Sequence, residues 1–325
     1  MKRAFVTGAT GFLGLNLIEQ LQPLAWEVTA FHLPEEDLRY LSRYPVDMVG
    51  GNILDYPSLL NAMPESVDAV FHLAGDTSMW SKHAERQYAV NVTGTANVCR
   101  AAMVRNAGRF IHTSSSSAYG YHSVRLNERT PSNALDCGMN YNRTKYLAEQ
   151  EVKKAVDRGL FAVLLNPCNI IGPYDPGNWS QLIKNVHNNK LPGFPPGTGT
   201  FAHVRDIANA HIAAVDKGRK GENYLLGGVE ASFKEVIGEI MQVTGKQLPL
   251  KEISARKLQI AWALSSLKSF FTRQEPMLTY PKYKRLVGNL ICDNSKASRE
   301  LGFKTTTIRE MVTDSYHWLE QENLL

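Results

Sequence analysis

The stretch Ala4-Phe5-Val6-Thr7-Gly8-Ala9-Thr10-Gly11-Phe12-Leu13-Gly14 decides the fold of this chain. It opens with an apolar run that predicts a strand, and its three glycines predict a tight turn into a helix. Such a turn lets the backbone approach a pyrophosphate without an intervening Cβ, and the helix presents free N–H groups to the anion. We therefore predict a dinucleotide site here, against the alternative of a strand–helix turn with no ligand.

The rest of the first half continues this alternation of strands and helices. Strands are predicted at residues 27–33, 47–49, 69–73, 110–113 and 161–166, and helices at about 13–21, 85–106 and 141–158. Alternating strands and helices are typical of a parallel sheet covered on both faces. We expect an α/β fold with a Rossmann-type, doubly wound sheet.

The chain changes character after Pro167. Residues 172–200 are rich in Gly, Pro and Asn, which predicts loop with one helix at about 180–187, and the last hundred residues are mostly helical. We expect a dinucleotide-binding domain of residues 1–166 plus about 201–228. A smaller, mostly helical substrate-binding domain would take about 167–200 plus 229–325.

Residues 254–272 predict an amphipathic helix with a wide apolar face. Two interpretations are open. The face either packs in the core of the small domain, or it forms a wall for a hydrophobic substrate or a lipid-facing surface.

Composition narrows the functional classes. The net charge of +5 is scattered without a basic run, which argues against a nucleic-acid partner. The four cysteines (99, 137, 168 and 292) lack zinc-ligand spacing, so no metal is expected. No stretch has the length of a signal-peptide core or a membrane span. We expect a cytoplasmic protein without an integral membrane segment.

Tyr141 and Lys145 are the candidate catalytic pair. At i and i+4 they share one face of the predicted helix, where the lysine ammonium would lower the pKa of the phenol toward neutrality. A serine run, 114–117, follows the strand at 110–113 and would lie at the ligand-binding edge of the sheet. A hydroxyl there would polarise a substrate oxygen.

The motifs of this chain resemble those of the extended short-chain dehydrogenases/reductases. They occur in the expected order from residue 3 to about 320: TGATGFLG, FHLAG, NVTGT, IHTSSSSAYG, YNRTK, NPCNIIGP, FAHVRDIANAH and CDNSKASRELGF. The resemblance implies a seven-stranded parallel sheet and a C-terminal substrate domain.

It also implies roles by position. Ser115, Tyr141 and Lys145 match the catalytic residues, and Asn91 matches the asparagine associated with a proton-relay water. The expected substrate residues are Ser115, Ser116, Tyr141, Trp80 and Asn169. The expected cofactor residues are Gly8, Thr10, Gly11, Phe12, Leu13, Gly14, His32, Arg39, Ile53, Leu73, Ala74, Gly75, Thr113, Tyr141, Lys145, Pro167, Asn169 and Ile170.

Three branches of the family compete. Dehydratases carry acidic residues after the active-site serine, where this chain has Ser116 and Ser117. Epimerases usually carry an arginine just before the segment that begins at Phe201, where this chain has Gly199 and Thr200. The chain is most similar to the dihydroflavonol-reductase-like and hydroxysteroid-dehydrogenase-like branch. We expect an NAD(P)H-dependent oxidoreductase that reduces a ketone or aldehyde, or oxidises the matching alcohol. The alternatives are an NAD-dependent sugar-nucleotide epimerase and an NADP(H)-binding regulatory protein without turnover.

The end of the second predicted strand bears on the cofactor. His32 stands where a carboxylate would favour NAD(H), so NADP(H) is favoured, while the acidic residues 35–37 leave NAD(H) open. The family resemblance also implies a homodimer through helices at about 85–106 and 141–158. The substrate is expected to be a small, apolar carbonyl compound or alcohol.

Overall fold

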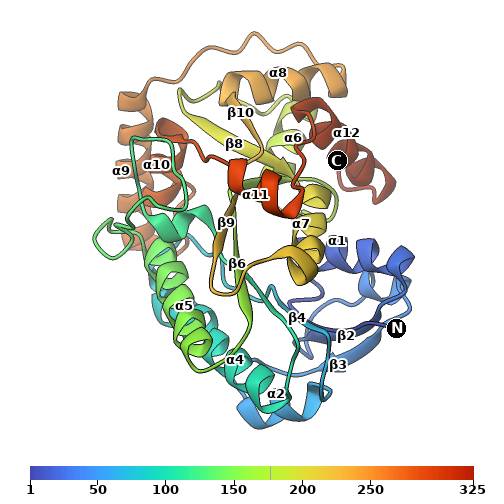
Figure 1. Ribbon diagram of the computed structural model, residues 1–325. Helices are drawn as coiled ribbons and strands as arrows, with labels where there is room; N and C mark the ends of the chain where they lie inside the picture. The colour runs from blue at the N-terminus through green and yellow to red at the C-terminus, as the bar shows by residue number, and fades with distance from the viewer. Residues whose placement is uncertain (176) are drawn as a thin grey trace.

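Seven parallel strands form the central sheet of the computed structural model, which describes residues 1–175 and 177–325 (Figure 1). Their order is β3-β2-β1-β4-β5-β6-β9. This order confirms the predicted doubly wound sheet, and it reverses direction between β1 and β4, where a crevice opens beyond the carboxyl ends of the strands. The bounds are β1 Arg3–Thr7, β2 Glu27–His32, β3 Asp47–Gly50, β4 Ala69–His72, β5 Phe110–Thr113, β6 Ala162–Pro167 and β9 Asn223–Leu226.

Helices cover both faces of this sheet. On one face α1 (Phe12–Leu21) packs on α7 (Val204–Lys217), and α7 packs on α11 (Ser295–Leu301). On the other face α4 (Thr95–Val104) packs between α2 (Tyr56–Ala62) and α5 (Asn140–Asp157). Each layer buries its own apolar cluster against the sheet, which fixes the strand ends in space.

The helix predicted at about 85–106 is confirmed as a continuous helical stretch over residues 84–104, although its geometry changes along its length. The chain forms α3 (Ala84–Tyr88), a π-helical segment (Ala89–Gly94) and then α4. The Asn91 side chain is tied to the turn after β4, since its Oδ1 accepts a hydrogen bond from the Asp76 N–H at 2.7 Å. A π segment re-aims side chains locally and is frequent at functional sites.

A second, smaller sheet lies in the C-terminal part. Strand β8 (Thr198–His203) pairs with β7 (Asn169–Ile171), β10 (Val229–Ser232) and β11 (Asn289–Leu290). The prediction of loop through residue 200 is therefore wrong at 198–200, and residues 201–203 belong to the smaller sheet. Helices α6 (Trp179–His187), α8 (Phe233–Thr244) and α12 (Ile308–Gln321) pack together with it in one core. The predicted domain bounds stay a prediction.

Two further helices, α9 (Ala255–Thr272) and α10 (Tyr280–Val287), pack against each other at one side of the molecule (Figure 1). Only Leu258 and Ser269 of α9 are buried. The interpretation of this helix as core packing is therefore wrong, because the core of the small domain is completed by α6, α8 and α12.

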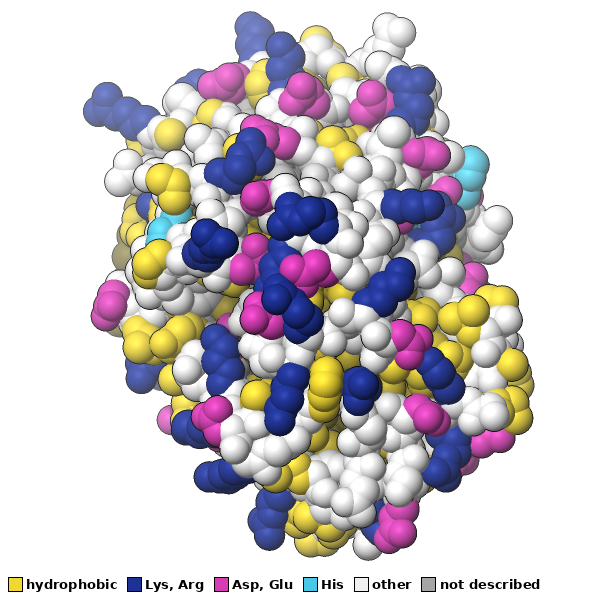
Figure 2. Space-filling view, viewed as in Figure 1, with side chains coloured by type: hydrophobic (Ala, Val, Ile, Leu, Met, Phe, Trp, Pro, Cys, Tyr) yellow, Lys and Arg dark blue, Asp and Glu magenta, His cyan; other side chains and the backbone are white. Residues whose placement is uncertain are grey.

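The surface shows no field of one charge on the face drawn in Figure 2, where Lys and Arg are interspersed with Asp and Glu. Within residues 1–175 and 177–325, no helix has the length and apolarity that a bilayer crossing requires.

The glycine turn depends on close backbone packing. Gly8 has φ +69°, and a Cβ there would lie 2.7 Å from the Ala74 nitrogen. A Cβ on Gly14 would overlap the Gly8 carbonyl oxygen. Both positions therefore require glycine, because the obstructing atoms are backbone and cannot move aside.

Gly14→Val should destabilise the fold by about 2–3 kcal/mol, since the added side chain overpacks the turn. Gly238→Ala is the matched control, because Gly238 lies in α8 with open space at the position that a Cβ would take, and alanine should stabilise that helix by about 0.5–1 kcal/mol. Urea unfolding measures both changes. If Gly14→Val were as stable as the wild type, the packing described for the turn would be contradicted.

Candidate active site

A cleft of about 390 Å³ opens at the carboxyl ends of β1, β2 and β4. The glycine turn forms one wall, and the segment after β4 forms another. Eight of the predicted cofactor residues line this cleft: Gly8, Thr10, Gly11, His32, Ile53, Leu73, Ala74 and Gly75.

The residues of the cleft fit a dinucleotide. Helix α1 begins after Gly11, whose position carries no side-chain cap, so the first amides of the helix are not satisfied by a capping side chain. Those amides and the positive end of the helix dipole suit a pyrophosphate. Because Gly8 and Gly14 have no Cβ atoms, the backbone of the turn can pack tightly beside the position of the pyrophosphate.

Other predicted cofactor residues lie outside this cavity. Phe12, Leu13 and Gly14 form the first turn of α1, and Thr113 and Pro167 end β5 and β6 at the same edge of the sheet. Their position at this edge of the sheet is compatible with the predicted cofactor contacts, which stay a prediction.

Three predicted cofactor residues are held elsewhere. Asn169 is buried and its Nδ2 donates to the Thr200 carbonyl at 2.9 Å, which ties β7 to β8. Ile170 packs against the core on the α1 face of the sheet. Arg39 pairs with Asp37 at 2.9 Å, and its guanidinium lies 4.7 Å from the Tyr40 ring centroid, away from the cleft lining.

Glu36 lines the cleft, although the sequence placed it only within an acidic run after β2. Its carboxylate accepts a hydrogen bond from the Thr10 hydroxyl of the glycine turn. The sequence did not show which acidic residue of this run would turn back toward the phosphate turn, because that depends on the loop conformation.

Three of the four predicted catalytic residues, Ser115, Tyr141 and Lys145, converge at the end of β5 and the start of α5. Tyr141 and Lys145 lie one turn apart in α5, and both are buried. Ser115 follows β5, and a hydrogen bond between its hydroxyl and the Tyr141 phenol is one of the influences that lower the pKa of Tyr141. The Lys145 ammonium donates to the Thr113 carbonyl at 3.0 Å.

The expected effect of Lys145 on the phenol is not what the structure shows. Burial raises the pKa of Tyr141 above its ordinary value, and the influences of Ser115 and the Arg285 charge only oppose this increase. The cause is desolvation of the phenolate in a site where Lys145 is engaged by a backbone carbonyl. Burial also lowers the pKa of Lys145, to about 8. Tyr141 is therefore a protonated phenol at neutral pH.

A buried carboxylate supports the lysine. Glu149, one turn after Lys145 in α5, accepts hydrogen bonds from Ser114 Oγ at 2.5 Å and Asn166 Nδ2 at 2.6 Å. Its negative charge raises the pKa of Lys145 against the effect of burial. Sequence reasoning missed Glu149, although its i+4 spacing from Lys145 was visible.

Asn91 holds together the elements around the site. Besides the Asp76 N–H, its side chain contacts Thr144, since Nδ2 donates to Thr144 Oγ1 at 3.1 Å. Its backbone carbonyl accepts from Thr95 Oγ1 at 2.6 Å. The contacts shown are therefore structural, and the predicted relay role is untested.

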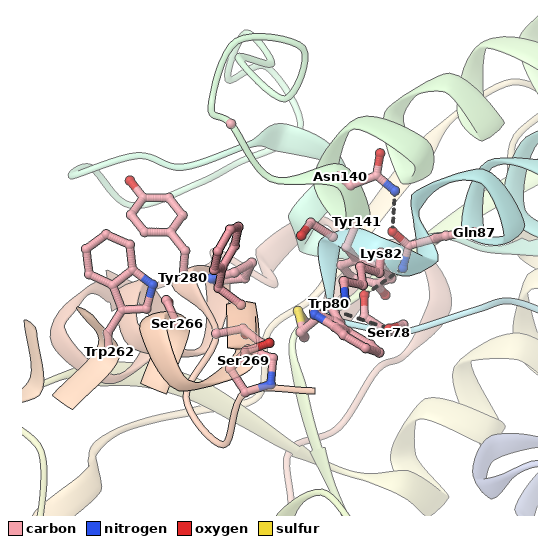
Figure 3. A pocket seen from close by; sticks show the side chains of 17 residues that line it. Ser78, Trp80, Lys82, Gln87, Asn140, Tyr141, Trp262, Ser266, Ser269 and Tyr280 are labelled. Atoms are coloured by element: carbon pink, nitrogen blue, oxygen red, sulfur yellow. Dashed lines mark hydrogen bonds between the residues drawn. The ribbon is translucent and has the colours of Figure 1, made fainter. Parts of the chain in front are cut away.

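A second cavity of about 360 Å³ adjoins Tyr141 (Figure 3). Trp80, Gln87 and Asn140 line the side that carries Tyr141, and the Asn140 amide donates to Gln87 Oε1 at 2.7 Å. Helices α9 and α10 line the opposite side, where Figure 3 shows Trp262, Ser266, Ser269 and Tyr280. The predicted substrate residue Trp80 is thus in the cavity wall.

Ser116, also predicted to contact substrate, lies elsewhere. It is buried, and its hydroxyl interacts with the thiols of Cys168 and Cys292. Ser117 instead lines a smaller adjoining cavity with Asn142. Ser116 and Ser117 lie in a short 3₁₀ turn that follows Ser115, and such a turn directs successive side chains to different sides.

Arg285 of α10 lines the same smaller cavity. Its positive charge acts on the Tyr141 phenol and lowers the pKa of Tyr141, opposing burial. Sequence reasoning missed this residue because α10 approaches α5 only in the folded chain. In the described part of the chain, no group of three or more His, Cys, Asp or Glu is placed to hold a metal ion.

Comparisons with known proteins agree with this geometry. The model of the NAD-dependent epimerase/dehydratase family matches residues 4–227. Sterol demethylase protein B of Methylococcus capsulatus is 30% identical, with 98% of this chain and 99% of that protein covered. A Synechocystis protein provisionally named dihydroflavonol 4-reductase is 29% identical, with 97% and 94% covered.

A solved structure supports the fold. The UDP-glucuronic acid 4-epimerase of Bacillus cereus, in complex with NAD, superposes with a TM-score of 0.78 at 22% identity, with 98% of this chain and 96% of that chain covered. At this identity the likeness shows the fold alone. Together with the matched family model, these findings show that the chain belongs to the NAD-dependent epimerase/dehydratase family of extended short-chain dehydrogenases/reductases and is an NAD(P)-dependent enzyme.

Proposed function

We propose that this enzyme reduces a ketone or aldehyde group of an apolar, ring-containing substrate by hydride transfer, or oxidises the matching alcohol. The observation that carries the proposal is the position of the Tyr141–Lys145 pair: Tyr141 lines a cavity with aromatic walls, and a Cβ on Gly75 of the dinucleotide cleft would lie 3.4 Å from Lys145 Nζ. A protonated phenol suits the donation of a proton to a developing alkoxide.

Each catalytic residue has a distinct part. A bound nicotinamide would supply the hydride. The Ser115 hydroxyl would donate a hydrogen bond to the substrate oxygen, and the Tyr141 phenol would give that oxygen its proton. The Lys145 ammonium, held charged by Glu149, would stabilise the phenolate that remains.

The walls of the substrate cavity indicate the class of substrate. Trp80 on one side and Trp262 and Tyr280 on the other present flat aromatic surfaces to a space of about 360 Å³. Such a space suits an apolar ring compound with few polar groups. The names of the two similar proteins, which refer to a sterol and a dihydroflavonol, are consistent with this class.

The epimerase alternative is kept because of Arg285. Its guanidinium lies in the cavity beside the Tyr141 site, and it would suit the diphosphate of a sugar nucleotide. An epimerase would keep its NAD bound and would not consume added NADH. The regulatory alternative lacks such an observation, since Tyr141 and Lys145 are both present.

For the cofactor, we propose NAD(H) in place of the NADP(H) preference expected from sequence. The Glu36 carboxylate lines the cleft beside Thr10 and would repel a 2′-phosphate, whereas it would accept a hydrogen bond from a ribose hydroxyl. Arg39, a cation among the expected cofactor residues, pairs with Asp37. The homodimer through the helices at 85–106 and 141–158 stays a prediction.

Tyr141→Phe should lower the rate of NADH consumption with apolar ketones by about 10²–10⁴-fold, because the proton donor is lost. NADH binding, followed by fluorescence, should change little. Tyr88→Phe, an exposed phenol on α3, is the matched control and should keep full activity. The proposal fails if the Phe variant retains wild-type turnover, or if no carbonyl compound is consumed while a sugar nucleotide is interconverted.

Glu36→Gln should reduce the preference of the enzyme for NADH over NADPH. The wild type should bind NADH about tenfold or more tightly than NADPH, since a like charge beside the phosphate is costly. The variant should bind NADPH more tightly, with NADH little affected. Glu35→Gln removes the same charge one residue away and should change neither affinity. Tighter wild-type binding of NADPH than of NADH would contradict this assignment.

Lys145→Met should reveal the cost of burying the ammonium. In the unfolded chain the lysine keeps its ordinary pKa of 10.5, against about 8 in the fold. Between these values the unfolded chain binds more protons, so the contribution of Lys145 to stability rises with pH. The variant should therefore be more stable than wild type by about 2 kcal/mol at pH 7, with a gap that closes toward pH 10.

Urea unfolding across this pH range measures the gap. Lys154→Met, an exposed lysine of the same helix, should show no such pH dependence. A difference between wild type and Lys145→Met that is constant with pH would contradict the depressed pKa.

A further inference from the structure

Helix α9 presents an apolar stripe to solvent. Ile260, Leu264, Leu267 and Phe271 are spaced by four, three and four residues, which places them on one face of the helix. Each of these side chains is between 53% and 75% exposed. A continuous exposed stripe of large apolar side chains is unusual on a protein surface and marks a surface that binds something.

The opposite side of α9 faces the protein. Leu258 and Ser269 are buried there, and Trp262 and Ser266 line the substrate cavity (Figure 3). The helix therefore separates the cavity from the stripe. Its two faces have different roles, and the stripe is not needed to complete the core.

The charged residues around the stripe are mostly positive. The segment from Ile253 to Cys292 contains seven Lys and Arg residues and one acidic residue, Glu275. The net charge of this segment exceeds the +5 of the whole chain. Arg285 faces the cavity beside Tyr141 and Lys282 pairs with Glu275, so the charge next to the stripe comes from the other five cations of the segment. By helical spacing, Lys257 and Lys268 lie beside the stripe on the same face. At the left edge of Figure 2, where Figure 1 shows α9 and α10, hydrophobic side chains reach the surface.

We propose that this stripe docks the enzyme on an anionic lipid bilayer, with α9 lying in the plane of the interface. The apolar side chains would enter the boundary between headgroups and acyl chains, and Lys257 and Lys268 would reach anionic headgroups. A protein partner or a second copy of this chain would not need the excess of positive charge that surrounds the stripe. The single helix between bilayer and cavity would also place the cavity next to membrane-dissolved apolar compounds.

The test is co-sedimentation of the full chain with vesicles of phosphatidylcholine, with and without an equal amount of phosphatidylglycerol. It does not rest on the proposed reductase function, because neither cofactor nor substrate is present. The chain should bind the vesicles that contain phosphatidylglycerol and release them at high salt. Lys257→Gln/Lys268→Gln should weaken binding by about fivefold per charge. Lys190→Gln/Lys304→Gln, which removes two exposed lysines elsewhere, should bind like wild type.

The stripe itself is tested by Leu264→Gln/Leu267→Gln/Phe271→Gln, which keeps the charge unchanged and should abolish sedimentation with vesicles. Val104→Gln, an equally exposed apolar residue on α4, is its control. An unchanged melting temperature and unchanged NADH binding show that the stripe variant is folded. The proposal is overturned if the chain binds vesicles equally well with and without phosphatidylglycerol, or if the stripe variant binds like wild type. It is also overturned if light scattering without vesicles shows a dimer that the stripe variant loses.

Discussion

The close backbone contact between the glycine turn and the segment after β4 is the constraint on which the rest of the structure depends. Gly8 approaches the Ala74 backbone, and Gly14 packs against the Gly8 carbonyl, at distances that admit no side chain. This contact fixes the start of α1 relative to β1 and β4, at the point where the order of the sheet reverses. The dinucleotide cleft exists because the turn is this compact.

The active site follows from the same edge of the sheet. Strand β5 delivers Ser115 and the Thr113 carbonyl, and α5 delivers Tyr141 and Lys145 beside them. Burial makes the ionisation of both side chains costly, which keeps the phenol protonated and lowers the pKa of the lysine to about 8. Glu149 limits that decrease, so the site depends on a buried carboxylate as well as on Ser115, Tyr141 and Lys145.

Features set by local geometry could be predicted from the sequence. The glycine turn and the i, i+4 pairing of Tyr141 and Lys145 need only chain geometry, and the alternation of strands and helices gave the sheet. Features set by contacts between distant segments could not. The π segment carries Asn91, whose side chain bonds the separate turn at Asp76, and the position of Arg285 depends on how α10 approaches α5. The outward stripe of α9 could not be told from a core-facing one, because its spacing is the same in both cases.

The central claim is that a hydride passes between nicotinamide and a substrate carbonyl beside Tyr141. Mass spectrometry of the product formed from NADH that carries deuterium at both C4 positions of the nicotinamide, with the ketone that is consumed fastest, tests this claim most directly. Hydride transfer beside Tyr141 predicts deuterium on the carbinol carbon of the product. Product without label, or interconversion of a sugar nucleotide while the added NADH keeps its deuterium, would contradict it.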